Sequence, residues 1–320
     1  MFQTLTHQTK KLLLTALLPG LIMTSAAIAQ TWQVVDFPNQ DNLTGVSFLS
    51  PDTGYVVSSS GKIARTIDAG KTWGGVKIST APLEDVFFAN STTVYVCGAR
   101  GGVFTSNDGG RNWKDRSLSD TSITLLSIRR LSPQSLLVLG MTRDSIRSNI
   151  GVAMRSVDDG VTWKALPSMG TSYGEMLVTP DKTVRFLSWG AMHTSNDFGA
   201  TWHETKLPDG KPGRVMDMIG RTGIMAGNFG QIAHSSDGGK TWEQMPLPQE
   251  ESHFTSAVLI NEREGYIAGF GSRVYYTSDG GRKWAREPLP RACDLIAMTK
   301  VGNRLWAVGA DGIILWKKIK

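Results

Sequence analysis

Residues 254–284 show the hydrophobic pattern that recurs along the chain. They read as an apolar strand "TSAVLI", a polar turn "NEREG", a second strand "YIAG", a glycine loop and a third strand "RVYYTS", after which a fourth strand follows Trp284. The same order fits residues 43–73, and period-two alternation, as at 215–219, is typical of β-strands. The pattern predicts a repeating unit of four strands, which we call strands A to D.

A short motif stands between strands C and D of each repeat. A Ser or Thr, an Asp two residues later, a Gly two residues after that and a closing Trp recur in six copies: "RTIDAGKTW" (65–73), "TSNDGGRNW" (105–113), "RSVDDGVTW" (155–163), "TSNDFGATW" (194–202), "HSSDGGKTW" (234–242) and "TSDGGRKW" (277–284). Successive tryptophans lie 40, 50, 39, 40 and 42 residues apart. A period near forty with short strands predicts a β-propeller.

We expect the aspartates of this motif to be structural. They are Asp68, Asp108, Asp158, Asp197, Asp237 and Asp279. A short carboxylate in a turn accepts hydrogen bonds from nearby backbone N–H groups, and the glycine allows a positive φ. A calcium loop needs several alternating oxygen donors, whereas each of these turns has one Asp.

The two ends of the chain predict a seventh repeat. Residues 293–316 supply strands A, B and C without the motif, and "TWQVVDFP" at 31–38 matches a strand D and its continuation at 241–248. The N-terminal strand should complete the last blade and so remove exposed sheet edges. We therefore predict an all-β fold, a seven-bladed propeller over residues 30–320. Its blades lie at about 39–80, 81–120, 121–167, 168–208, 209–248, 249–290, and 291–320 with 31–38.

The first 29 residues are typical of a secretory signal peptide. Lys10 and Lys11 precede the apolar run "LLLTALLPGLIM", and Ala27 and Ala29 form an A-x-A cleavage site, so the mature chain is expected from Gln30. No cysteine stands at the cleavage site, and no later stretch reaches the roughly 18 apolar residues of a membrane helix. Without the two signal lysines the chain has 32 basic and 28 acidic side chains. This mild, dispersed excess does not indicate a nucleic-acid partner.

Cys97 and Cys293 are the two cysteines. An oxidising compartment would permit a disulfide between them. Because the repeat places them in different, non-adjacent blades, we expect two buried free thiols instead.

The repeats match the Asp-box, or bacterial neuraminidase repeat, which indicates a fold and leaves activity open. Within that group the chain resembles the photosystem II stability/assembly factor family of plastids and cyanobacteria. The resemblance rests on "GKIARTIDAGKTW", "GGVFTSNDGGRNW", "GQIAHSSDGGKTW" and "SRVYYTSDGGRKW", with "GYIAGFG" and "LWAVGADG". It implies a non-enzymatic propeller that binds membrane-protein subunits during assembly. Relatives also occur in bacteria without photosynthesis, and cyanobacterial members are often lipoproteins, which this signal does not predict.

A carbohydrate-active enzyme is the alternative. A sialidase uses an arginine triad, a Tyr–Glu nucleophile pair and an acid/base Asp, yet residues 30–64 contain no arginine. Glu84 with Asp85, and Glu250 with Glu251, fall near blade starts, where we expect adjacent carboxylates to be solvated.

We predict no metal and no cofactor. A zinc site needs three or four ligands, and His193, His203, His234 and His253 are scattered without a suitably spaced carboxylate.

Partner binding is expected on the face that has the B–C loops and the links between blades, which we call the B–C face. These loops vary more than the Asp-box turns of the opposite, Asp-box face, as binding loops tend to. Their varying residues include Arg100, Trp189, Phe229, Phe270, Arg273 and Asp311. Aromatic and Arg side chains are typical of interface cores. The alternative is that the aromatic side chains pack against neighbouring blades.

Blade three is about ten residues longer than the others. We place the extra length in its B–C loop, residues 141–151, where Arg143 and Arg147 flank Asp144; Arg129 and Arg130 lie on strand A of the same blade. One interpretation is a solvated charge run. The other is a basic finger that binds acidic loops or lipid headgroups.

Together these patterns favour an exported, non-catalytic assembly or accessory factor that binds a membrane-protein complex and contacts the membrane at most peripherally. The expected location is the periplasm, or the thylakoid lumen in a photosynthetic host. A sialidase- or glycosidase-type enzyme and a non-catalytic glycan- or lipid-binding module are the alternatives.

Overall fold

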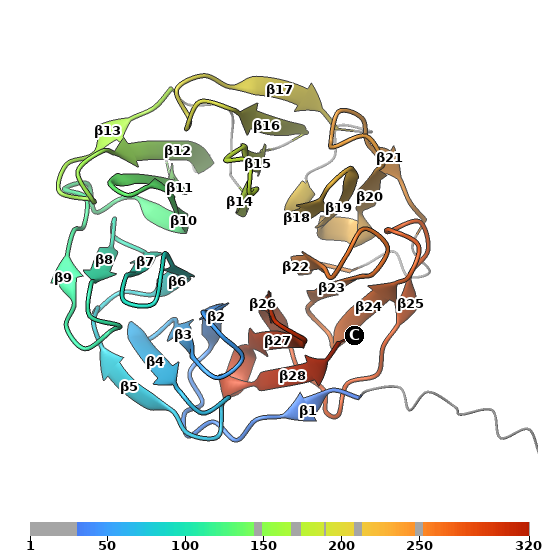
Figure 1. The fold of residues 1–320 in the computed structure, drawn as a ribbon, viewed down its shortest axis with the longest axis horizontal. Coiled ribbons are helices and arrows are strands. Elements are labelled where there is room, and N and C mark those ends of the chain that lie inside the picture. Colours follow the sequence, from blue (N-terminus) through green and yellow to red (C-terminus); the bar gives the residue numbers. More distant parts are fainter. Residues whose placement is uncertain are drawn as a thin grey trace, which may run out of the picture.

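Seven four-stranded antiparallel sheets form a ring, which Figure 1 shows along its axis. The computed structural model describes residues 31–143, 149–167, 174–188, 190–207, 213–246 and 252–319, so the expected signal peptide at 1–29 lies outside it. The prediction of an all-β, seven-bladed propeller is confirmed. Across these ranges no helix is long and apolar enough to span a membrane.

The first three blades follow one another along the chain. Their strands are β2 (Leu43–Phe48), β3 (Gly54–Ser58), β4 (Lys62–Thr66) and β5 (Gly74–Lys77); β6 (Leu83–Phe88), β7 (Val94–Gly98), β8 (Val103–Ser106) and β9 (Lys114–Asp115); and β10 (Thr124–Ser132), β11 (Ser135–Arg143), β12 (Asn149–Ser156) and β13 (Lys164–Ala165).

Blades four to six repeat the same order. Their strands are β14 (Met176–Val178), β15 (Val184–Ser188), β16 (Ala191–Ser195) and β17 (His203–Lys206); β18 (Gly213–Ile219), β19 (Thr222–Gly227), β20 (Ile232–Ser235) and β21 (Glu243–Gln244); and β22 (Phe254–Leu259), β23 (Gly265–Gly269), β24 (Arg273–Thr277) and β25 (Ala285–Arg286). A 3-10 turn, η2 (Asn228–Gly230), joins β19 to β20.

The seventh blade joins the two ends of the chain. Its strands are β26 (Leu295–Val301), β27 (Arg304–Gly309), β28 (Ile314–Lys318) and β1 (Gln33–Val34), with the 3-10 turn η3 (Ala310–Gly312) between β27 and β28. Gln33 pairs with Trp316, and β1 occupies the outer position of a sheet ordered β1-β28-β27-β26. The predicted closure by the N-terminal strand is therefore confirmed.

The core lies between adjacent blades. One apolar cluster joins Tyr55, Val57 and Ile63 of blade one to Leu83 and Val96 of blade two. Strand β7 is buried at every position because neighbouring blades cover both of its faces. Burial of one large aliphatic side chain is worth ~1.5–3 kcal/mol, so these interfaces contribute strongly to stability.

Each Asp-box turn is held by the same hydrogen bonds. In blade one, Thr66 Oγ1 donates to Asp68 Oδ1 over 2.9 Å, and accepts from the N–H of Gly70 over 2.8 Å. Asp68 also accepts from the N–H and Oγ1 of Thr72 over 2.9 and 2.6 Å. Equivalent bonds occur at Asp108, Asp158, Asp197, Asp237 and Asp279. Such donors favour the ionised carboxylate and lower its pKa, to about 2 at Asp68.

The turn glycine also permits contact between blades. Gly110 has φ +83°, and a Cβ there would lie 1.8 Å from Tyr55 Oη. That hydroxyl donates to the carbonyl of Gly109 over 2.5 Å and so joins blade one to the Asp-box turn of blade two.

The extra length of blade three is partly strand, which corrects the predicted loop. Arg143 pairs with Asn149 at the end of a continuous β11–β12 ladder, so Met141–Arg143 and Asn149–Gly151 belong to strands. Period-two alternation is weak in "MTRDSIRSNIG", and pairing within the hairpin decided the outcome. The side chain of Arg143 and all of residues 144–148 lie outside the described part.

Both cysteines are free, as expected, but only Cys97 is fully buried; Cys293 is half-buried. Burial raises the pKa of both thiols. No group of three or more His, Cys, Asp or Glu able to hold a metal occurs among the described side chains.

Candidate functional site at the mouth of the central channel

A cavity of about 550 Å³ occupies the centre of the ring. Its wall consists of residues from the innermost strands of six blades, of Gly174 and Glu175 just ahead of the innermost strand of blade four, and of Met141, Ser188 and Asn228 at or just beyond the far ends of second strands. Most of these residues lie toward the B–C face, so the cavity is the mouth of the channel on that face, and it extends into the channel as far as Ser47, Phe87 and Thr299. The volume falls within the ~300–1,000 Å³ typical of ligand sites.

β-Bulges determine which side chains line this mouth. The pairing of six innermost strands with their neighbours shifts register by one residue near the strand start. The skipped residues all line the cavity, and they are Thr44, Glu84, Leu126, Arg214, Thr255 and Ile296. A bulge re-aims a side chain, which is why such irregularities recur at functional sites.

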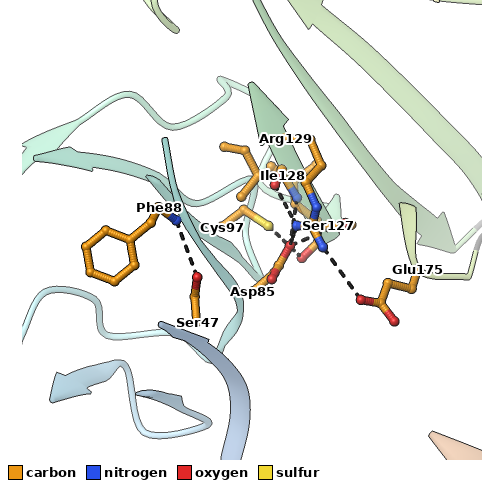
Figure 2. Close-up of polar contacts among 9 residues, drawn as sticks. Ser47, Asp85, Phe88, Cys97, Ser127, Ile128, Arg129 and Glu175 are labelled. Atoms are coloured by element: carbon orange, nitrogen blue, oxygen red, sulfur yellow. Dashed lines mark hydrogen bonds and ion pairs between the residues drawn. The ribbon is translucent and has the colours of Figure 1, made fainter. Parts of the chain in front are cut away.

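Arg129 links three blades inside the channel (Figure 2). Its Nη1 donates to Asp85 Oδ2 over 2.5 Å, and its Nη2 lies 3.6 Å from Glu175 Oε1. Asp85 also accepts from the N–H of Ile128 over 3.0 Å and from Ser127 Oγ over 3.3 Å. The carboxylate of Asp85 therefore has several polar partners. Glu175 lies farther from Arg129, and the side chain of Glu175 stays 45% exposed.

Three other carboxyl groups, in or near the channel wall, also have a raised pKa. Desolvation raises the pKa of Glu84 to about 7, although the positive charge of Arg214 opposes it. Burial raises the pKa of Asp217 to about 6, despite hydrogen bonds from the N–H groups of Leu259 and Met218 at 2.7 and 2.8 Å. Enclosure by the channel wall also raises the pKa of Glu175, although water reaches its side chain.

Exposed residues stand at the tips of the B–C turns, on the face to which the mouth opens. Arg100, Phe229 and Asp311 occupy equivalent tips in blades two, five and seven, with φ of 60°, 59° and 53°. Phe229 is 68% exposed, and Phe270 on the next blade is 37% exposed. Phe229 contacts the ring of His253, yet most of its apolar surface is open to water in a left-handed conformation, which points to a contact surface.

The structure brings only some of the site residues predicted from the sequence together on one face. Arg100, Phe229 and Phe270 lie on the B–C face, and the two phenylalanines are not core residues. Arg129 is instead inside the channel, and Arg130 binds the carbonyls of Ser132 and Pro133 in the turn between β10 and β11 on the Asp-box face. Trp189 and Arg147, like the side chain of Arg143, fall outside the described residues.

The sequence did not indicate that three further residues line the channel. Arg214 and Glu175 were not singled out, and Glu84 was expected to be solvated, whereas it is half-buried in the mouth. A charged residue just ahead of the apolar run of strand A is the available signal, since that is the bulge position.

Comparison with known proteins shows which family the chain matches. The family model for the photosynthesis system II assembly factor YCF48 matches residues 24–205 and 200–296. The chain belongs to this family. A curated YCF48-family relative, the photosystem II assembly lipoprotein Ycf48 of Synechococcus sp. (strain CC9902), is 26% identical over 298 residues, covering 75% of this chain and 87% of the relative.

Solved structures of the YCF48 family share the fold. YCF48 from Cyanidioschyzon merolae has a TM-score of 0.74 at 18% identity, over 90% of this chain and 99% of that one. A structure described as YCF48 bound to D1 peptide has a TM-score of 0.73 at 18% identity, over 93% of this chain and 100% of that one. A xyloglucanase from Paenibacillus sp. is 31% identical over 152 residues, which cover 34% of this chain and 15% of the enzyme.

Proposed function

We propose that this chain is an exported, non-catalytic propeller that binds a segment of a membrane protein while the complex of that protein is assembled. Family membership supports the assembly role, because the matching family is described as an assembly factor. One structure with the same fold is described as bound to D1 peptide, which supports a peptide segment as the partner's contact. In a photosynthetic host the corresponding partner is the D1 subunit.

The assignment of partner binding to the B–C face rests on the open channel mouth and on the exposed aromatic side chains of that face. Phe229 and Phe270 are exposed on the same face as a cavity large enough for a side chain or a short peptide, and Phe229 follows the lining residue Asn228. Exposed aromatic groups next to a concave pocket are typical of interface hot spots. Arg143 and Arg147 remain a sequence-based extension of this surface.

The relatives and the signal sequence support a location outside the cytoplasm. Two curated relatives are named photosystem II assembly lipoproteins. Together with the N-terminal pattern this supports a periplasmic location, or the thylakoid lumen in a photosynthetic host.

In vivo crosslinking followed by mass spectrometry tests the proposal. We expect the wild type to capture a membrane-protein subunit, and Phe229→Asn combined with Phe270→Ala to reduce that capture at least tenfold. Arg100→Glu and the pair Arg143→Glu with Arg147→Glu extend the test to the basic side chains. Val157→Ser on the Asp-box face, where Val157 is 63% exposed, is the matched control. Equal capture by the Phe and control variants would contradict the B–C face.

A glycosidase is the second candidate, favoured by the partial similarity to a xyloglucanase. Hydrolysis of a glycoside needs two carboxyl groups on opposite sides of the bond. Here Glu84 and Asp85 are consecutive on one strand, and Asp85 is bound to Arg129. We expect no turnover in a screen of chromogenic glycosides, sialosides and xyloglucan fragments. Turnover abolished by Glu84→Gln would establish the enzyme instead.

A further inference from the structure

The six bulge residues of the channel mouth divide into three kinds. The hydroxyl groups of Thr44 and Thr255 have hydrogen-bond partners, since they donate to the carbonyls of Leu83 and Leu295 in the next blade over 2.6 and 2.8 Å. Leu126 and Ile296 are apolar. The two that remain, which are Glu84 and Arg214, are charged. Neither makes an ion pair or a side-chain hydrogen bond with any described residue, so each offers its charge to the cavity.

Glu84 and Arg214 stand on well-separated parts of the wall. Glu84 belongs to blade two and Arg214 to blade five, so two blades separate them on one side of the ring and three on the other. They influence each other across the cavity: Arg214 lowers the pKa of Glu84, and Glu84 raises that of Arg214. Neither reaches the other within ion-pair distance.

This arrangement leaves the half-buried Glu84 poorly compensated, whereas the side chain of Arg214 is exposed to water and can pair with a ligand. Desolvation raises the pKa of Glu84 and lowers that of Arg214 more strongly than their mutual attraction opposes these shifts. A partly desolvated charge without a partner destabilises the fold, and a ligand that brings the opposite charge recovers that energy. The wall between them combines apolar and charged residues, with Leu126, Met141 and Gly174 beside Arg129 and Glu175.

We propose that the channel mouth binds a dipolar peptide segment, whose basic group pairs with Glu84 and whose carboxylate pairs with Arg214. This inference rests on the proposed function, because it names the chemistry of the partner segment that the mouth accepts. The two charges orient the segment across the cavity, while Leu126, Met141 and Gly174 offer contacts for the side chains between them. Glu175 also lines the cavity, at the Arg214 end, because its N–H donates to the carbonyl of Arg214 over 3.2 Å.

Isothermal titration calorimetry with three blocked peptides tests the pairing. The probe is acetyl-Lys-Ala-Ala-Glu-amide, and each control peptide replaces Lys or Glu by Gln. We expect the wild type to bind the dipolar probe about tenfold more tightly than either control, as one charge-assisted contact is worth ~1.4 kcal/mol or more. Equal affinity for all three peptides would overturn the inference.

Substitutions assign each end of the peptide. Glu84→Gln should abolish the preference for Lys, and Arg214→Gln the preference for Glu, each with about a tenfold loss. The exchange Glu84→Arg with Arg214→Glu should restore binding of the probe in the reverse orientation. Glu243→Gln and Lys240→Gln, both exposed and outside the channel, are matched controls expected to have no effect. Unchanged affinity in Glu84→Gln and Arg214→Gln would overturn the inference.

Further results distinguish a failure of the dipolar site from a failure of the proposed function, and a peptide ligand from a lipid. In one outcome the wild type captures a membrane subunit in crosslinking, and Glu84→Gln and Arg214→Gln change neither the capture nor the peptide affinity. This outcome would overturn the dipolar site and leave the proposed function supported. A wild type that discriminates the peptides but captures no subunit would do the opposite. Binding to phosphatidylethanolamine vesicles, whose headgroup is also dipolar, without discrimination among the peptides would overturn the assignment to a peptide.

Discussion

Trp32 and Glu287 lie 255 residues apart, yet the indole Nε1 of Trp32 donates to Glu287 Oε2 over 3.0 Å. The same carboxylate accepts from Lys317 Nζ over 2.6 and 2.7 Å. Lys317 follows the strand partners of β1 on β28, and Trp32 immediately precedes β1. Glu287 of blade six therefore holds both chain ends of blade seven, and this contact fastens the ring.

Glu287→Ala should destabilise the protein by about 2–4 kcal/mol, because it leaves the buried Lys317 ammonium without its partner. Adding Lys317→Met should recover most of that loss. Urea unfolding followed by tryptophan fluorescence measures both effects. The more exposed pair of Lys62 and Asp41 provides the control, since Lys62→Met should cost at most about 1 kcal/mol. Similar costs for the two pairs would show that the ring does not depend on Glu287.

Thr66→Val tests the Asp-box turn at a buried position. The Thr66 hydroxyl accepts the N–H of Gly70, and removing it leaves that buried donor unsatisfied. We expect a loss of ~1–3 kcal/mol in the free energy of unfolding. Thr66→Ser, which keeps the hydroxyl, should lose less than half as much. Equal losses would mean that packing of the methyl group, and not the hydrogen bond, is what matters.

The Asp-box carboxylates make the fold sensitive to acid. Hydrogen bonds hold the pKa of Asp158 and Asp197 at about 2, below the ordinary 3.8. A depressed pKa in the folded state stabilises it above the unfolded value, and this stabilisation disappears as pH falls from about 3.8 through about 2. Acid titration with near-ultraviolet circular dichroism should show unfolding in this window. Asp158→Asn combined with Asp197→Asn should weaken the dependence on pH, and an unchanged slope would refute this origin.

Glu84 predicts the opposite dependence near neutral pH. Its pKa is raised from 4.5 to about 7, so the folded state holds this proton more tightly than the unfolded chain does. Stability from this group is complete below about 4.5 and is lost as pH rises through about 7. Glu84→Gln should therefore gain on the order of 1–2 kcal/mol over the wild type between pH 4.5 and pH 8. Urea unfolding at several pH values measures the difference, and a constant difference would contradict a raised pKa.

Phe229 and Phe254 form a matched pair for distinguishing surface from core. Phe254 is fully buried, and Phe254→Ala should cost about 3–5 kcal/mol. Phe229 is exposed at a positive φ, a conformation that Asn tolerates better. Phe229→Asn should change stability by less than about 1 kcal/mol, in either direction. A large loss would assign Phe229 a structural role through its edge contact with His253.

The periodic parts of this fold were predictable because they depend on local chemistry. A carboxylate, a glycine with positive φ and a tryptophan define each turn within nine residues, and the unmatched strand at 31–38 predicted how the ring closes. The channel was not predictable in the same way. Whether Glu84 faces solvent or a cavity depends on a one-residue bulge, and its relation to Arg214 depends on the order of blades around the ring. The extra length of blade three was assigned to a loop because nothing in those residues reveals that Arg143 pairs with Asn149.

The shared last sheet has a consequence for the whole molecule. The first and the final strands of the described chain are neighbours, so the circle is completed only when the two extremities meet. Loss of a few residues from either extremity by proteolysis would thus act on the entire assembly of blades rather than fray one corner. We expect such a molecule to resist trimming while intact and to fall apart as a unit once opened.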